Sequence, residues 1–127
     1  MAKLEYFLVA QDVSVDQRTN CISLFHIIEE IAVPQIPVNW HQMIAVSAWN
    51  PEEGDQEKDF QAEVRVVEPD GETKEFCRNF RIEGKRCRVI MYFQGVPLKA
   101  CGTLHFDLLL NGQHQASHSI DVKLAEQ

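Results

Sequence analysis

The fold of this chain is decided by the stretch GTLHFDLLLNGQHQASHSIDVKL, which covers residues 102–124. Successive side chains of a β-strand point to opposite faces, and apolar residues recur at alternate positions on both sides of Asn111-Gly112. The apolar positions carry even numbers throughout: Leu104, Phe106, Leu108 and Leu110, then Ala116, Ile120, Val122 and Leu124. Asparagine followed by glycine is typical of tight hairpin turns. The stretch therefore predicts two antiparallel strands that share one buried face.

The loop of this hairpin is set by the parity of the apolar positions. A two-residue loop at Asn111-Gly112 would place each apolar side chain beside a polar one, which is costly where one face is buried. A three-residue loop that ends at Gly112 restores the match, because glycine accepts the left-handed conformation that such loops require. We predict the three-residue loop. His114 and His118 then lie on the apolar face and His105 on the polar face, so the three histidines do not converge.

A second hairpin is predicted around Glu68-Pro-Asp-Gly-Glu72, where proline, aspartate and glycine suit a type I turn followed by a glycine bulge. This loop has three residues as well and preserves parity. Each cross-strand pair contributes about 0.5 kcal/mol to a sheet. The predicted pairs are Val64 with Phe76, Phe60 with Phe80 and, on the outer face, Arg65 with Glu75.

Further strands are expected at residues 4–13, 21–31, 41–49 and 86–94. The first is apolar at odd and even positions alike, as in a strand covered on both faces. Residues 21–31 also fit a helical spacing, but their β-branched content and the hairpin they form with residues 4–13 favour a strand. The inner face of residues 86–94 is expected to consist of Val89, Met91 and Phe93.

Two segments are expected to connect sheets rather than belong to them. Residues 32–40 contain Pro34 and Pro37, which remove backbone donors, so this segment is predicted to cross from one sheet to the other. Residues 95–102 are expected to lead into the last hairpin. About eight strands, with no segment better explained by a helix, predict a single all-β domain over residues 1–127, an antiparallel β-sandwich.

Length, charge and cysteines limit the classes of function. The 127 residues suffice for one core, and the net charge of −7 argues against partners that need a concentrated positive field, namely nucleic acid and anionic membranes. No apolar run approaches the roughly 18 residues of a membrane span, and the N-terminus lacks the order of a secretory signal. No C-x-x-C pair occurs among the four cysteines, Cys21, Cys77, Cys87 and Cys101. We therefore expect reduced, structural thiols in a cytoplasmic protein without a cofactor.

Four stretches carry a resemblance to a known family: VAQDVSVDQRTN at 9–20, SLFHIIEEI at 23–31, QGVPL at 94–98 and GTLHFDLLLNG at 102–112. Across nearly its whole length the chain resembles a family of uncharacterised bacterial proteins defined as a domain of unknown function. The G-x-x-x-F-x-L approach to the last hairpin also resembles immunoglobulin-like sandwiches, although Leu104 stands where such domains often place tyrosine. The resemblance implies a small cytoplasmic domain of immunoglobulin-like fold and transfers no activity. The four cysteines are not part of it.

No catalytic set emerges from the sequence. Ser117, His118 and Asp121 are close in the chain, but on a strand His118 points to the opposite face from the other two. Cys87 stands between Arg86 and Arg88, whose charges favour a thiolate, yet a buried inert thiol is the commoner outcome. We expect no nucleophile at either place.

Potential metal ligands are scattered too. His114 and His118 would lie about 13 Å apart on an extended strand, which is too far for one ion without a bulge. The loop at residues 51–59 offers carboxylates of the kind that bind calcium: Glu52, Glu53, Asp55, Glu57 and Asp59. Their spacing matches no calcium motif, so a solvated loop is the simpler interpretation and no metal is expected.

One cluster of cations is a candidate partner-binding surface: Arg78, Arg81, Lys85, Arg86 and Arg88. The simpler interpretation is an ordinary charged hairpin. The alternative is a patch for an acidic protein partner. Because the chain also carries the acidic loop at 51–59, self-association through charge complementarity is a further hypothesis.

The lack of a converging catalytic set, together with open sheet edges, favours a non-enzymatic binding or assembly module. Its partner would be an unidentified protein or a second copy of the chain. The alternative is a small-molecule or metal-dependent enzyme with a site at one loop end, built from His41, the acidic loop and Asp70. A viral structural subunit is a third hypothesis, which rests on fold analogy alone.

Overall fold

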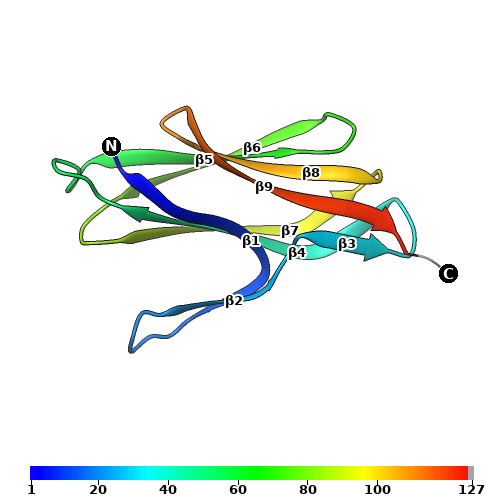
Figure 1. Cartoon of the computed structure of the whole chain (residues 1–127), viewed down its shortest axis with the longest axis horizontal. Helices are drawn as coiled ribbons and strands as arrows, with labels where there is room; N and C mark the ends of the chain where they lie inside the picture. The colour runs from blue at the N-terminus through cyan, green and yellow to red at the C-terminus, as the bar shows by residue number, and fades with distance from the viewer. Residues whose placement is uncertain (126–127) are drawn as a thin grey trace.

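The computed structural model describes residues 1–125, which form nine strands in two sheets packed face to face, with no helix in that range (Figure 1). One sheet has the order β2 (Ile22–Ile27), β1 (Lys3–Val15), β4 (Val38–Asn50) and β7 (Cys87–Leu98). The other has the order β3 (Glu30–Val33), β9 (Gln113–Leu124), β8 (Gly102–Leu110), β5 (Asp59–Val67) and β6 (Thr73–Arg81). Neighbouring strands are antiparallel except β3 and β9, which run parallel. The predicted sandwich is confirmed.

The core lies between the two sheets. β4 contributes Met43 and Trp49, whose indole Nε1 donates to Ser47 Oγ at 2.9 Å. The Trp49 ring stacks on Phe80 with centroids 5.9 Å apart. The expected inner face of β7, Val89, Met91 and Phe93, is buried as well. Alternation of apolar residues therefore located the core correctly on both layers.

The β5–β6 hairpin has the predicted register. Val64 pairs with Phe76, Phe60 with Phe80, and Arg65 with Glu75. Its turn closes through Gly71 N donating to Glu68 O at 2.8 Å, and Gly71 takes a φ of +92°. A left-handed residue after a type I turn is the glycine-bulge geometry expected from the sequence.

The β8–β9 hairpin has the predicted parity but a different loop. Asn111 and Gly112 both have positive φ, +48° and +83°, and Leu110 pairs with Gln113, so the loop has two residues. The predicted three-residue loop is wrong. Parity is restored inside β9 instead, where the register shifts between Leu108 and Leu109 so that Leu108 pairs with Ala116. Such a β-bulge inserts one residue into one strand and rotates the side chains that follow.

The segment at 21–31 is extended, as expected, but it breaks into two strands. β2 ends at Ile27, just after His26, which has a φ of +55°, and β3 begins at Glu30 beside β9 in the other sheet. The chain thus changes sheets near Ile28 and returns to β4 after Pro34 and Pro37. The predicted crossing from one sheet to the other is confirmed, but it is shorter than residues 32–40, because Ala32–Val33 belong to β3 and residues 38–40 to β4.

β7 is longer than predicted. Residues 95–98 were expected in a connection, yet Val96 and Leu98 pair with β4 and are buried. Pro97 is tolerated because β7 is the outer strand of its sheet. Gly95 has a φ of +69°. The buried residues of β7 have odd numbers before Gly95 and even numbers after it.

The β1–β2 arm, defined as residues 10–27, folds back as a partial third layer on the outer face of the β1–β4–β7 sheet (Figure 1). Outward-facing residues Ala10, Ile44, Val46 and Ala48 are fully buried although they lie outside the main core. Arg88 of β7 ties the tip of the arm to the sheet by donating to Asn20. The expected coverage of the first strand on both faces is therefore confirmed.

Candidate functional site

The open side of the sandwich is the first candidate site. β6 and β7 are the outer strands of their sheets, so each presents an unpaired backbone edge. A pocket of about 340 Å³ lies between them. Its floor is apolar and includes Phe93 and Phe106, whose ring centroids are 5.7 Å apart.

Two exposed aromatic residues flank this pocket. Phe76 of β6 is 40% exposed and Tyr92 of β7 is 60% exposed. The Phe76 ring meets Phe93 edge-on at 4.8 Å. Exposed aromatic side chains beside an apolar pocket are a common feature of binding sites.

The backbone edge of β7 is available within the pocket. Arg78 Nη1 donates to Ile90 O at 2.6 Å, so the Ile90 carbonyl faces the open side rather than β4. In an antiparallel strand, alternate residues turn their backbone groups to the same edge. Tyr92 and Gln94 therefore present their N–H and C=O groups towards the pocket that they line.

A buried carboxyl group stands at one end of the pocket. Glu68 is only 6% exposed, and its Oε2 atom has no hydrogen-bond partner among residues 1–125. Burial raises the pKa of Glu68, the neighbouring Glu72 raises it further, and the charge of Lys99, whose Nζ lies 3.9 Å away, acts in the opposite direction. The pocket thus contains a buried carboxylate oxygen, Glu68 Oε2, that accepts no hydrogen bond within residues 1–125.

Glu68, Asp70 and Glu72 together place carboxylate oxygens within 4.8 Å of one another. Lys99 Nζ already lies 2.8 Å from Glu72 Oε2 and lowers the pKa of Glu72. The cluster therefore has its own cation, and the turn geometry alone explains it, since Asp70 Oδ1 accepts from Glu72 N at 2.9 Å.

Four of the five predicted cations have partners within the chain. Arg78 reaches the edge of β7, Arg81 Nε pairs with Asp59 Oδ1 at 3.0 Å, and Arg86 Nη2 pairs with Glu5 Oε1 at 3.1 Å. Arg88 instead donates to two neutral oxygens of Asn20. Arg86 and Arg88 line a second pocket, of about 420 Å³, beneath the β1–β2 arm. The role of these residues in partner binding stays a prediction.

The residues expected for an enzyme site are not brought together. The acidic loop connects β4 to the start of β5, whereas Asp70 follows the end of β5 (Figure 1). Nine residues of strand separate them by about 27 Å. Within the loop, Asp55 is buried and its Oδ2 accepts from Glu52 N at 2.8 Å, so this carboxylate closes the loop.

The three histidines of the last hairpin hydrogen-bond nearby protein groups. His118 Nε2 hydrogen-bonds Ile28 O at 2.6 Å, and His105 Nδ1 bonds Ser119 Oγ at 3.0 Å. The prediction that His114 faces the apolar side is wrong, because the bulge in β9 turns it outward, where Nε2 bonds Ser117 Oγ at 3.0 Å. As expected, no set of three histidines converges within residues 1–125.

Ser117 does meet a histidine and a carboxylate, but in the wrong order for nucleophilic catalysis. Its Oγ donates to Asp107 Oδ1 at 2.6 Å and bonds His114 at the same time. In a catalytic triad the histidine lies between serine and carboxylate. Here the serine is in the middle, so no base withdraws its proton. His118 points inward, as predicted, and does not reach Ser117.

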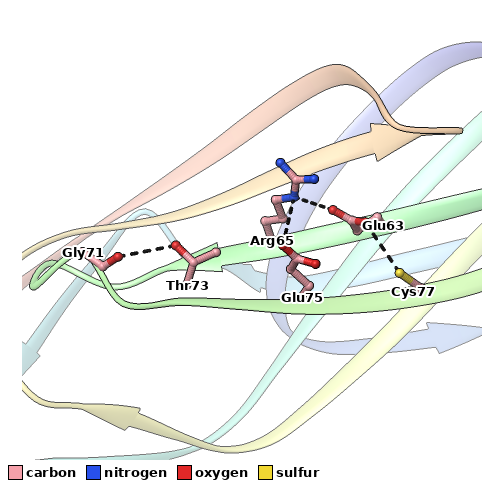
Figure 2. A network of polar contacts seen from close by, with 6 residues as sticks. All are labelled: Glu63, Arg65, Gly71, Thr73, Glu75 and Cys77. Carbon is pink, nitrogen blue, oxygen red and sulfur yellow. Dashed lines mark hydrogen bonds and ion pairs between the residues drawn. The ribbon is translucent and has the colours of Figure 1, made fainter.

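All four cysteines are free thiols, as expected, but the expected structural, buried positions are wrong: Cys21, Cys77 and Cys101 are exposed and Cys87 is half-buried. Figure 2 shows Cys77 on the outer face of β5–β6, where Sγ donates to Glu63 Oε1 at 3.6 Å beside Arg65 and Glu75. Partial desolvation and the Glu63 carboxylate raise the pKa of Cys77. Burial likewise raises the pKa of Cys87, which outweighs the nearby Arg78. Neither thiol is activated as a nucleophile.

The pocket residues Phe76, Tyr92 and Glu68 were not singled out by the sequence. Phe76 was assigned to the core from parity alone, and only the position of β6 at the edge exposes it. The one local signal is in β6 itself, where charged residues recur on both faces, as in edge strands.

Topology and pocket together define a class of protein. One sheet has the order β9–β8–β5–β6, with β3 parallel to β9, and it faces the strands β1–β4–β7. This is the strand arrangement of an immunoglobulin-like sandwich. Within that class, the chain belongs to the family of unknown function DUF6941, whose sequence model matches residues 5–123. The resemblance expected from the sequence is therefore confirmed. A search of curated proteins found no match.

Two solved structures resemble the fold. The alkylpurine DNA glycosylase AlkC of Pseudomonas fluorescens, bound to DNA containing an abasic site analogue, aligns with 96% of this chain at 10% identity and a TM-score of 0.59. The present chain spans only 30% of that glycosylase chain. An immunoglobulin-like protein from Pseudomonas aeruginosa aligns over 96% of both chains at 14% identity, with a TM-score of 0.43. At these identities the glycosylase supports the fold alone.

No helix within residues 1–125 is long and apolar enough to cross a membrane.

Proposed function

We propose that the protein is a non-enzymatic binding module that captures an extended segment of a partner protein along the open edge of β7. The observation that carries the proposal is the 340 Å³ pocket between two unpaired strand edges, flanked by exposed Phe76 and Tyr92. Addition of a strand to a sheet edge is a common mode of peptide recognition, because the backbone supplies affinity and side-chain pockets supply selectivity.

The pocket favours a particular peptide chemistry. The backbone groups of Tyr92 and Gln94 provide donors and acceptors for a paired strand. Phe76, Phe93 and Phe106 offer apolar surface for one large aliphatic or aromatic side chain of the peptide. The unpartnered Glu68 Oε2 then receives a hydrogen-bond donor, which suits a lysine or arginine further along the segment.

The proposal is tested with a phage-displayed library of random decapeptides selected on the purified protein. Enriched sequences are expected to combine an apolar anchor with a basic residue. Hydrogen exchange of the complex is expected to show new protection at the Tyr92 and Gln94 amides. A library that yields no enriched sequence, or peptides that protect other strands, would overturn the proposal.

Two controls distinguish pairing with the edge of β7 from nonspecific hydrophobic binding. Phe76→Asp is expected to abolish binding, whereas Phe25→Asp, at an aromatic residue of the arm with a similar 48% exposure, is expected to leave it unchanged. N-methylation of alternate peptide amides is expected to weaken binding only at the positions that face β7, because it removes a ladder donor. Equal loss in both protein variants would contradict the proposal.

The proposed place of action is the cytoplasm. The four free thiols support a reducing compartment, since cysteines of exported domains are commonly paired. The proposed partner is a protein; the formal net charge of −7 gives no support to nucleic acid.

A further inference from the structure

The second pocket lies at the start of β7, between the tip of the β1–β2 arm and the outer face of the β1–β4–β7 sheet. Its volume is about 420 Å³. Thr19, Asn20 and Cys21 form one wall, and Tyr6, Arg86 and Arg88 form the other. The pocket thus exists only because the arm folds back over the sheet.

The arm tip that forms one wall is held in a defined shape. Asp16 Oδ1 accepts from Arg18 N at 2.8 Å and from Thr19 N at 3.2 Å, and Asp16 O accepts from Asn20 N at 2.8 Å. Asn20 has a φ of +59°, which asparagine tolerates better than most residues. These bonds direct both the carbonyl and the side-chain oxygen of Asn20 towards Arg88.

Arg88 is a positioned cation whose charge is not neutralised by a carboxylate. Its Nη2 atom donates to Asn20 O and to Asn20 Oδ1, each at 2.7 Å, and both acceptors are neutral. Among residues 1–125 no carboxylate lies within ion-pair distance of Arg88, whereas Arg86 is paired with Glu5. A guanidinium carries five N–H donors, and those on Nε and Nη1 remain for a ligand.

The rest of the lining suits an oxyanion attached to a small apolar body. Tyr6 and Thr19, which each carry a hydroxyl group, line the pocket together with apolar Ile22. Two arginines line the same pocket, Arg88 in β7 and Arg86 just before that strand begins. Arginine binds phosphate and carboxylate by charge-assisted hydrogen bonds, and Nε and Nη1 of Arg88 can each supply one such bond.

We propose that this pocket is a binding site for an oxyanion ligand, a phosphate ester or a carboxylate, held by Arg88 and Arg86 and closed by the arm. The site is independent of peptide capture at β7. A ligand that bridges Arg88 and Thr19 links the arm to the sheet, so its binding stabilises the third layer.

Inorganic phosphate is the first probe, with acetate as a carboxylate probe and chloride at equal ionic strength as the baseline. Cys21 lines the pocket and is exposed, so its rate of alkylation by iodoacetamide reports occupancy, while exposed Cys101 serves as an internal control. Phosphate is expected to slow alkylation of Cys21 in a saturable manner and to leave Cys101 unchanged. Stronger protection by acetate would assign a carboxylate ligand instead. Equal rates in phosphate, acetate and chloride would overturn the proposal.

Two variants test the charge directly. Asn20→Asp places a carboxylate against Arg88 while it keeps both oxygen acceptors and the arm in place, and is expected to weaken phosphate binding at least about tenfold. Arg88→Gln is expected to do the same, and circular dichroism and urea unfolding show whether it still folds. Lys85→Gln removes a cation of the same cluster that does not line the pocket and is expected to bind normally. Unchanged protection of Cys21 in folded Asn20→Asp would refute the site.

Discussion

Arg78 of β6 donates from Nη1 to the carbonyl oxygen of Ile90 in β7 at 2.6 Å, and so links the edge of one sheet to the edge of the other. The two strands are the outer members of their sheets and otherwise touch little. The contact closes one part of the open side and leaves the pocket beside Phe76 and Tyr92 as the part where a backbone edge is accessible. A residue singled out for its charge therefore has a defined structural contact.

Removal of this link is expected to loosen the open side. Arg78→Ala loses a charge-assisted hydrogen bond that is partly exposed to water, so we expect a loss of about 1 kcal/mol in the free energy of unfolding. Urea denaturation monitored by Trp fluorescence measures it. Lys85→Ala, a neighbouring cation without a corresponding hydrogen bond, is expected to change stability by less than about 0.5 kcal/mol. Equal effects of the two substitutions would show that the link is not stabilising.

The two-residue turn predicts a position-specific effect of alanine. Gly112 has a φ of +83°, where a Cβ atom is strained although nothing lies within 4 Å of it. We expect Gly112→Ala to lower the free energy of unfolding by about 1–2 kcal/mol. Gly84→Ala, also in open space but without a positive φ, is expected to be neutral. If the two variants unfold at the same urea concentration, the turn assignment is wrong.

Glu68 is expected to give stability a specific dependence on pH. Because burial raises its pKa above that of an exposed glutamate, the folded protein binds more protons than the unfolded chain between the two values. The contribution of Glu68 to the free energy of unfolding is therefore fully present below its unfolded pKa, and it is lost as the pH rises through its folded pKa. Glu68→Gln removes the effect, so the variant should gain stability relative to the wild type as the pH rises above about 4, the ordinary pKa of a glutamate. Parallel pH profiles in urea denaturation would contradict this assignment.

The cysteines are expected to differ in reactivity in a way that exposure alone does not explain. Cys77 is exposed like Cys101, but desolvation and Glu63 raise its pKa, and only the thiolate reacts (Figure 2). We expect iodoacetamide to alkylate Cys77 several-fold more slowly than Cys101, as followed by peptide mass spectrometry. Glu63→Gln should increase the alkylation rate of Cys77 and leave that of Cys101 unchanged. An unaltered Cys77 rate in that variant would exclude the carboxylate as the cause.

Some of the architecture follows from short stretches of sequence. Alternation assigned most inner residues of β5, β8 and β9, although Leu124 at the end of β9 is exposed. The loop at Pro69–Gly71 fixed the register of β5–β6, because a turn type and a buried face specify the same pairing. The β8–β9 hairpin shows the limit of this reasoning. The alternation of apolar residues required one extra residue in this hairpin, in either the loop or a strand. Packing decided between the two, because Asn111 of the loop docks on β5, where Gln61 N donates to Asn111 Oδ1 at 2.9 Å.

The sequence by itself determined an all-β sandwich, its core faces and a cluster of cations, because these depend on the order of apolar and polar residues along each strand. Only the tertiary structure decided where binding surfaces arise. It exposed Phe76 by placing β6 at an edge, and it brought Asn20 to Arg88 by folding the arm over the sheet. Both outcomes depend on contacts between residues far apart in the chain, and such contacts have no local pattern.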